Sequence, residues 1–386
     1  MYRGNSNKSQ LANSLKPRIY LVYEGRLGSS RADSTYVLEN ARVFSRFTDV
    51  EILVSKRINW TIPSTLKTEF CIRELGKAFN PKTLFQSIRG QVAFGIQVRK
   101  YLNRAANARS AIVFHDWWPL QSLHTMFRRR RKYQIVLEVH NQIPRNRLTR
   151  FLFKHVNLFV ATNEPKYLEL KECFPGKVIL ERNCVRLDRY INPPNSPDDL
   201  SQLISSFTSR FNFVIGYTGS FGDEKNPNLL AELPKHLPDI GFLYVGNIKS
   251  QYLSKLMQLP NVLLTGPQSA EYIPSIQAKC NALLISLDKN NLVSRRYTST
   301  MKLMEYVAAR KPIIAPRLES IQDLLSEKEC YFYTADSVDS CCEAINSIFG
   351  EKNQSLELRM PANSRLEELS WERRNKRIFQ LLYANL

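Results

Sequence analysis

The sequence predicts an α/β protein built from two doubly wound parallel sheets. Its 386 residues are too many for one ordinary core and suit two domains. The hydrophobic content of 43% is ample for packed interiors. Short apolar runs rich in β-branched residues alternate along the chain with longer segments of helical periodicity, and this alternation is typical of parallel strands joined by helices.

The predicted strands form two groups of six, each strand separated from the next by room for a helix. The strands of the first half are expected at 18–24, 50–55, 111–115, 134–140, 157–162 and 177–181. Those of the second half are expected at 212–219, 241–246, 261–266, 281–287, 311–315 and 330–334. Parallel sheets bind ligands at the carboxyl ends of their strands, so we expect two such domains to face a cleft that holds the ligand.

These segments define the expected domains. We predict a leader without stable structure at 1–17, an N-terminal domain at 18–192, and a linker rich in Pro and Asp at 193–211. A C-terminal domain follows at 212–365. The last segment, 366–386, is predicted to be a helix that crosses back to the N-terminal domain.

Several classes of protein are disfavoured by composition. No apolar run approaches the length of a membrane-spanning helix, and the polar, basic start of the chain lacks the apolar centre of a secretory signal. Seven scattered cysteines, without a Cys-x-x-Cys pair, predict reduced thiols and no metal site. We therefore expect a cytoplasmic protein.

Positive charge is concentrated in the first half. The chain has a formal net charge of +20, and residues 1–200 hold 34 Lys and Arg against 16 Asp and Glu. A basic helix at 84–109 and the run "MFRRRRKYQ" at 126–134 belong to this half. Such a surface suits an anionic membrane leaflet, which would make the protein peripheral at the inner face, or an acidic or lipid-linked acceptor. The alternative is an ordinary solvated face; nucleic acid is not expected, because no nucleic-acid-binding motif appears.

The stretch "GYTGSFGDEKNPNLL" at 216–230 predicts a site for an anion. A buried strand ends at Gly219, and Asn226 and Pro227 are suited to the N-cap and first position of a helix. Lys225 thus lies beside a helix N-terminus, which favours negative charge, and a diphosphate would fit there. The alternative is a solvated lysine near an ordinary turn.

The stretch "YTSTMKLMEYVAARKP" at 297–312 predicts a loop capped by Ser299 or Thr300, followed by a helix. Glu305 stands off the buried stripe of this helix, and a carboxylate there fits a ribose diol. Backbone amides from Ser299 to Met301 would hold phosphate beside it. The alternative is a solvated surface glutamate. The buried stripe is predicted to consist of Leu303, Met304, Val307 and Ala308.

Two predicted strands of the N-terminal domain end in histidine. "IVFHDWWPL" supplies His115 followed by Asp116, and "IVLEVHNQIPRNR" supplies His140 followed by Asn141. Histidine at a strand end can bind substrate hydroxyls, and the alternative is a loop histidine satisfied by the backbone. In the first loop, "YEGRLGSS", Gly28 would let the backbone approach a ligand closely, although no dinucleotide fingerprint is present.

The second half resembles the donor-nucleotide domain of retaining glycosyltransferases of family four. The resemblance rests on "GYTGSFGDEKNPNLLAEL", "NVLLTGPQSAEYIPSIQAKCNALLISL" and "TSTMKLMEYVAARKPIIAP", and it extends to the closing "LSWERRNKRIFQLL". It implies a GT-B fold of two Rossmann-like domains. It also implies that Glu305 binds the ribose and Lys225 the diphosphate of a nucleotide-sugar. The other expected donor-binding residues are Gly28, Gly219, Ser220, Ser299, Thr300, Met301 and Lys302.

By the same resemblance, His140 would reach the transferred sugar with help from Asn141. His115 and Asp116 would lie on the acceptor side. This sequence departs from the family at two positions: Ser220 stands where an arginine is frequent, and Tyr297 stands where a second carboxylate is frequent. Arg295 and Arg296 are near enough in the chain to supply the missing cation. The identity of the sugar stays open.

The expected function is glycosyl transfer from a nucleoside-diphosphate-sugar to a hydroxyl of a glycan or lipid-linked acceptor, with retained anomeric configuration, in cell-surface polysaccharide or glycolipid synthesis. The nucleotide-sugar is a substrate, and no cofactor or metal is expected. One alternative is a nucleotide-sugar epimerase on the same fold. The other is a non-catalytic anion-binding protein with this fold.

Overall fold

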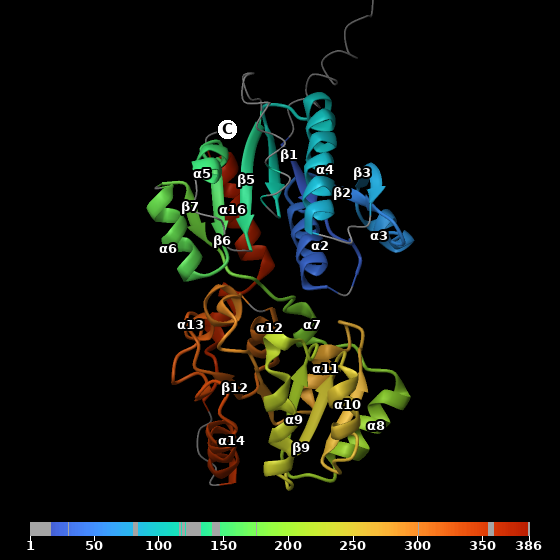
Figure 1. The fold of residues 1–386 in the computed structure, drawn as a ribbon, viewed down its shortest axis with the longest axis vertical. Coiled ribbons are helices and arrows are strands. Elements are labelled where there is room, and N and C mark those ends of the chain that lie inside the picture. The colour runs from blue at the N-terminus through green and yellow to red at the C-terminus, as the bar shows by residue number, and fades with distance from the viewer. Residues whose placement is uncertain are drawn as a thin grey trace, which may run out of the picture. The chain divides into compact units, whose positions relative to one another are not determined.

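The computed structural model describes residues 17–29, 31–79, 84–115, 117, 120, 133–140, 147–174, 176–299, 301–353 and 359–384. The chain divides into two compact units, of which unit 1 contains 1–182 and 371–386 and unit 2 contains 183–370. Each unit is a parallel sheet with helices on both faces (Figure 1). The predicted α/β fold with two doubly wound sheets is confirmed.

The sheet of unit 1 has seven parallel strands in the order β3-β2-β1-β4-β5-β6-β7. Strand order reverses between β1 and β4, and in doubly wound sheets ligands bind beside this point, at the carboxyl ends of the strands. The six predicted strands are present, and a seventh, β3, was not predicted. The strands are β1 (Arg18–Tyr23), β2 (Asp49–Arg57), β3 (Ile72–Phe79), β4 (Ser110–Phe114), β5 (Tyr133–Val139), β6 (Leu158–Ala161) and β7 (Val178–Leu180).

Side chains of β1 alternate between two cores. Tyr20 and Val22 pack with the helices of one face, whereas Ile19, Leu21 and Tyr23 pack with those of the other. The first face is covered by α4 (Leu84–Ala105), α5 (Arg147–Phe153) and α6 (Glu164–Cys173), and the second by α2 (Ala32–Phe44) and α16 (Trp371–Tyr383). The unit also contains α3 (Ser64–Glu69).

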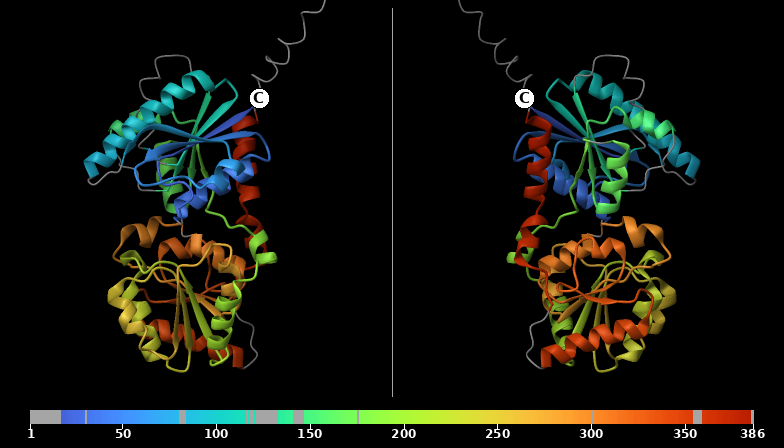
Figure 2. Two further views of the ribbon diagram at one scale, coloured as in Figure 1. Left: turned by 90° about the vertical axis from the view of Figure 1, so that its right-hand side faces the viewer. Right: turned by 90° about the vertical axis from the view of Figure 1, so that its left-hand side faces the viewer.

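The last helix, α16, packs against α2 in unit 1, although the segments before it belong to unit 2 (Figure 2). Ile378 and Leu382 are buried in the core that α2 shares. At the surface of the same helix, Arg46 pairs with Glu372 at 2.8 Å. This helix is the predicted terminal helix, and its first residue is Trp371.

The basic helix α4 packs on the sheet through one buried stripe. Phe94, Val98 and Leu102 are buried at a spacing of four residues. Val92 and Ile96 of the same helix are only partly buried. The cations Arg89, Lys100 and Arg104 are exposed; the basic run at 128–132 and the leader at 1–16 lie outside the described residues.

The sheet of unit 2 has six parallel strands in the order β10-β9-β8-β11-β12-β13, and all six were predicted. Its order reverses between β8 and β11. The loops that follow these two strands therefore flank the expected ligand position. The strands are β8 (Val214–Thr218), β9 (Gly241–Val245), β10 (Val262–Gly266), β11 (Ala282–Leu284), β12 (Ile313–Pro316) and β13 (Tyr331–Tyr333).

Helices cover both faces of this sheet. One core contains residues of α8 (Asp198–Thr208), α11 (Ile273–Ala278) and α12 (Met301–Ala309), and the other contains residues of α9 (Pro227–His236), α10 (Ser250–Leu256) and α14 (Val338–Asn353). The remaining short helical segments are α7 (Asp188–Ile191), η2 (Asp223–Lys225), η3 (Val293–Tyr297), α13 (Glu319–Gln322) and α15 (Asn363–Glu368).

The predicted linker at 193–211 is wrong for most of its length. Its Pro- and Asp-rich start precedes α8, and Leu200, Ile204 and Phe207 of this helix are buried in the core of unit 2. These residues recur at the spacing of a helical face, which the polar start of the segment obscured. The units divide earlier, between Arg182 and Asn183.

The described parts of the chain contain no helix with the length and apolar character needed to cross a bilayer. All seven cysteines are unbridged, and four of them, Cys184, Cys280, Cys330 and Cys341, are buried.

Candidate active site

The loop after β8 has a backbone that only glycine suits. Gly219 has φ 144° and Gly246, after the neighbouring β9, has φ 143°. A Cβ on Gly246 would come within 2.1 Å of the Gly219 carbonyl oxygen, so the two loops touch through their backbones. Beneath them, Tyr217 donates its hydroxyl hydrogen bond to the Ser220 carbonyl at 2.8 Å. The loop is thus held in one shape at the carboxyl edge of the sheet.

Lys225 ends the short helix η2, immediately before α9. Asn226 caps α9 by accepting a hydrogen bond from the Leu229 amide at 3.2 Å, and Pro227 is the first helical residue, as predicted. Burial lowers the pKa of Lys225, and Glu224 opposes this shift. A partly buried ammonium beside a helix N-terminus suits an anion.

Glu305 lies in the middle of α12, whose predicted buried face is confirmed. Leu303, Met304, Val307 and Ala308 are all buried, whereas Glu305 is partly exposed. Burial raises the pKa of Glu305 to about 7, although Lys302 and Arg189 lower it. The neighbouring Tyr306 accepts a hydrogen bond from the Thr218 amide at 3.0 Å and so ties α12 to the end of β8.

Lys302, one turn before Glu305, places its ammonium against the Gly219 loop. Its Nζ lies 3.6 Å from the centre of the Tyr217 ring. This Nζ is buried and has no hydrogen-bond partner among the described residues. Burial lowers the pKa of Lys302 well below its usual value, and Lys225 lowers it further, whereas Glu305 and Glu224 raise it. The charges of Lys225 and Glu305 are thus near enough to affect the pKa of Lys302.

The other predicted donor-binding residues differ in what they offer. Ser299 is engaged by Asn183, whose side-chain amide donates to the Ser299 carbonyl. Ser220 is exposed, and its carbonyl is engaged by Tyr217. Met301 is the first residue of α12. Gly28, in unit 1, has φ 83°, and its amide donates to Ser34 Oγ at 2.8 Å, so this amide is already used.

One of the two positions that depart from the resembled family, Tyr297, lies in the protein interior, and the arginines before it lie at the surface. Tyr297 is buried in η3. Arg296 pairs with Glu319 at 3.5 Å, and Arg295 is exposed. The ion pair of Arg296 and the exposure of Arg295 do not support the expectation that these arginines supply the missing cation.

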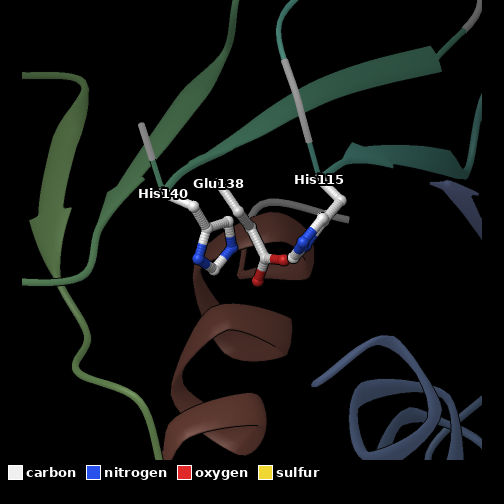
Figure 3. Close-up of side chains that lie close together, drawn as sticks. All are labelled: His115, Glu138 and His140. Atoms are coloured by element: carbon white, nitrogen blue, oxygen red, sulfur yellow. The ribbon is translucent and has the colours of Figure 1, made fainter. Parts of the chain in front are cut away.

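In unit 1 the ends of β4 and β5 bring His115 and His140 together. Their ring centres are 4.2 Å apart, with the rings tilted by 36°. Figure 3 shows Glu138 close to both imidazoles. Burial lowers the pKa of both histidines, so both are neutral at neutral pH. His115 Nδ1 and His140 Nε2 are buried and have no hydrogen-bond partner among the described residues.

An ion pair that the sequence analysis missed supports this histidine pair. Arg374 of α16 donates to Glu138 Oε1 at 2.8 Å, and Tyr36 of α2 donates to the same oxygen at 3.0 Å. The Tyr36 ring packs edge-on against His140, with centres 4.5 Å apart, and lies 5.2 Å from His115. One signal could have revealed it: a glutamate inside the apolar strand "QIVLEV" needs a cationic partner.

Lys166 of α6 holds the backbone of His140. Its Nζ donates to the His140 carbonyl at 2.7 Å and to Thr162 Oγ1 at 3.3 Å. Burial lowers the pKa of Lys166 to about 7. Helix α6 therefore fixes the backbone of His140, and Tyr36 fixes its ring.

His115, Glu138 and His140 are the described residues with the types and spacing of a metal site, with ligand atoms within 4.8 Å of one another. However, Glu138 Oε1 already accepts from Arg374 and Tyr36, and a divalent cation would share this carboxylate with a guanidinium. Two neutral imidazoles with free nitrogens suit hydroxyl groups at least as well. The expected absence of a metal stays a prediction.

The structure thus groups the predicted residues into two sets. Lys225 lies in the loop after β8, and Lys302 and Glu305 lie on α12 of the same unit, whereas His115 and His140 pair at the strand ends of unit 1. Asp116, Asn141 and Thr300 lie outside the described residues.

Comparison with known proteins identifies the domain that carries the first set. Residues 212–351 match the family model described as glycosyl transferases group 1. This segment is a glycosyltransferase domain. It contains the Gly219 loop, Lys225, Lys302 and Glu305. The prediction of a glycosyltransferase domain is confirmed for this segment.

One curated relative matches part of the chain. It is TuaH of Bacillus subtilis (strain 168), named as a teichuronic acid biosynthesis glycosyltransferase, and it is 22% identical over 190 residues. The match covers 48% of this chain and 46% of that protein, so the chain spans about half the length of the curated relative.

Solved structures match nearly the whole chain. Anabaena HepE in complex with UDP and glucose has a TM-score of 0.71 at 13% identity, covering 95% of this chain and 100% of that one. Sucrose-phosphate synthase from Thermosynechococcus elongatus has a TM-score of 0.73 at 15% identity, covering 95% and 98%. These similarities bear on the fold and confirm the predicted GT-B architecture.

Proposed function

We propose that this protein is a retaining glycosyltransferase that moves a sugar from a nucleoside-diphosphate-sugar to a hydroxyl acceptor. The observation that carries the proposal is the position of three charged residues inside the segment that matches the glycosyltransferase model. Lys302 of α12 places its ammonium at the Gly219 loop, Glu305 follows one turn later on the same helix, and Lys225 lies in the loop after β8. A carboxylate and ammonium groups at the switch point of a parallel sheet match the two ends of a ribose diphosphate.

The donor is assigned to unit 2. Glu305 accepts hydrogen bonds from the ribose diol, and Lys225 with the N-terminus of α9 binds the diphosphate. When the bond between sugar and phosphate breaks, negative charge grows on the leaving diphosphate and positive charge on the sugar ring. A cation placed at the leaving group stabilises this state, and loss of one such contact typically costs about 3 kcal/mol of barrier.

The sugar and acceptor are assigned to unit 1. His140 Nε2 and His115 Nδ1 are buried and without partners among the described residues, so they offer hydrogen bonds to sugar or acceptor hydroxyls. Neutral imidazoles suit this role because each nitrogen can accept or donate according to tautomer. In the same-face mechanism that the family resemblance implies, the leaving phosphate itself takes the proton of the acceptor hydroxyl.

UDP-sugars are the first donors to test, because HepE was solved with UDP, with UDP and glucose, and with UDP-glucose. The name of TuaH supports a role in cell-surface polysaccharide synthesis. The basic excess of residues 1–200 supports an acidic or lipid-linked acceptor, and the exposed Arg89, Lys100 and Arg104 of α4 would face an anionic surface at the inner side of the membrane.

The test is donor turnover in the presence and absence of a chelator. We expect nucleotide release from one sugar donor, unaffected by EDTA, with the anomeric configuration of the product retained by NMR. Lys225→Met and Glu305→Gln should each reduce turnover at least about a hundredfold. Unchanged turnover in both variants would refute the site. An epimerised sugar that remains attached to its nucleotide, without use of acceptor, would instead favour an epimerase.

A further inference from the structure

The side chain of Lys302 is unusual among the charged groups of unit 2. Its Nζ is buried, yet it has no hydrogen-bond partner among the described residues. An ammonium has three donors, and burying it without an acceptor costs several kcal/mol. The Tyr217 ring, whose centre is 3.6 Å from Nζ, makes a cation–π contact but accepts no hydrogen bond in the way an oxygen would. Such a cost points to a ligand that supplies the missing acceptors.

The surrounding backbone leaves room for this ammonium. A Cβ on Gly219 would come within 2.7 Å of Lys302 Nζ, so the glycine is needed to let the amine reach the loop. The loop itself is held by Tyr217 from below and by the backbone of Gly246. The amine therefore lies at the carboxyl end of β8, where a ligand of this sheet is expected.

The charged neighbours of Lys302 favour an anion. Lys225, also partly buried, repels it, whereas Glu305 and Glu224 attract it. None of the ion pairs among the described residues joins Lys302 to either glutamate. Two nearby ammonium groups are poorly compensated without a ligand, and a diphosphate would provide two or more negative charges and several acceptor oxygens.

We propose that the Lys302 side chain is the second cation of the diphosphate site, acting together with Lys225. This inference rests on the proposed function and deepens it. It identifies the second cation of the site. Ser220 has no charge, and Arg296 pairs with Glu319. It also assigns Gly219 a role, since any larger residue would displace the amine from the loop.

The experiment compares binding of UDP, GDP and ADP, and of the matching nucleosides, by calorimetry at pH 7.5. Lys302→Met should lower the affinity for the preferred diphosphate at least about tenfold, because a charged hydrogen bond to phosphate is lost. The affinity for the nucleoside should stay the same. The ligand-free variant should also melt at a higher temperature, because an unpaired buried charge has been removed. Lys255→Met, at an exposed lysine of α10, is the matched control and should change neither quantity.

Equal diphosphate affinity in Lys302→Met and wild type would overturn the inference. A parallel loss of nucleoside and diphosphate binding would also overturn it, since the lysine would then only support the loop. If Lys302→Met does not fold, Lys302→Gln is judged by the same criteria. If Lys225→Met and Glu305→Gln lose diphosphate binding but Lys302→Met does not, this inference fails and the proposed function stands. If wild type binds none of the diphosphates, the proposed function itself fails.

Discussion

Arg374 and Glu138 form a buried ion pair between residues that are 236 positions apart in the chain. Their side chains are 1% and 3% exposed, and Arg374 Nη2 lies 2.8 Å from Glu138 Oε1. The pair joins the last helix of the protein to the strand that ends at His140. The terminal helix therefore contributes directly to the surroundings of the histidine pair.

Removal of Arg374 should destabilise unit 1 strongly. Arg374→Met leaves the Glu138 carboxylate buried without its cation, and such a loss typically costs about 3–5 kcal/mol in the free energy of unfolding. Urea denaturation measures this cost. Arg46→Met breaks the exposed pair with Glu372 on the same helix and should cost less than about 1 kcal/mol. Similar costs for both variants would contradict the importance of the buried pair.

His140→Ala should slow sugar transfer without weakening nucleotide binding. His140 belongs to unit 1, whereas the proposed nucleotide-binding groups all belong to unit 2. We expect kcat to fall about a hundredfold and the affinity for UDP to stay the same, as measured by steady-state kinetics and calorimetry. His236→Ala, at an exposed histidine of α9, is the control. A loss of UDP affinity in His140→Ala would show that the assignment of the two units is wrong.

Donor binding should weaken as the pH falls through 7. The pKa of Glu305 is raised to about 7 by burial, and the ribose diol requires its carboxylate form. One unit below this pKa about a tenth of the groups are ionised, so KM for the donor should rise roughly tenfold between pH 8 and pH 6. Glu305→Gln should remove this dependence. A wild-type KM that is constant over the range would contradict the role of the carboxylate.

The raised pKa of Glu305 also affects how stability depends on pH. The effect is opposite in sign to that of a salt-bridged carboxylate, whose pKa is lowered by folding. Between the ordinary pKa of 4.5 and about 7, the folded protein binds the proton of Glu305 more tightly than the unfolded chain does. The contribution of this group to stability is therefore present at low pH and lost as the pH rises. Glu305→Gln should raise Tm at pH 8 but not at pH 4.5. An equal shift at both values would mean that the carboxyl is not desolvated.

Gly246→Ala should disrupt the donor loop. An alanine there would take up a backbone conformation with φ 143° and bring its Cβ within 2.1 Å of the Gly219 carbonyl oxygen. We expect UDP affinity and Tm both to fall. Gly350→Ala, in α14 where a Cβ would meet no other atom, should instead stabilise the protein by about 0.5–1 kcal/mol. Normal UDP binding by Gly246→Ala would show that the loop tolerates another shape.

Much of the fold could be predicted because the signals are local. Buried parallel strands are continuous apolar runs, and β8, β9, β11 and β12 of unit 2 are buried over their whole lengths. The missed strand β3, "IRELGKAF", lies at the edge of its sheet and carries charged residues, so its pattern resembles a polar loop. Helix α8 was hidden behind a start rich in Pro and Asp, although its buried residues keep helical spacing.

The site could be predicted only in part, for the same reason. Lys225 and Glu305 lie in segments whose caps and periodicity can be recognised locally. The partners of Glu138 come from α2 and α16, and no local pattern connects them to β5. Likewise, the burial of Lys302 against Tyr217 depends on how α12 packs on β8.

Calorimetric titration of UDP and UDP-glucose into wild type, Lys225→Met and Glu305→Gln tests the nucleotide site of unit 2 most directly. The structure predicts saturable binding to wild type and a loss of at least about tenfold in affinity in each variant. Equal affinity in all three proteins would contradict the assignment.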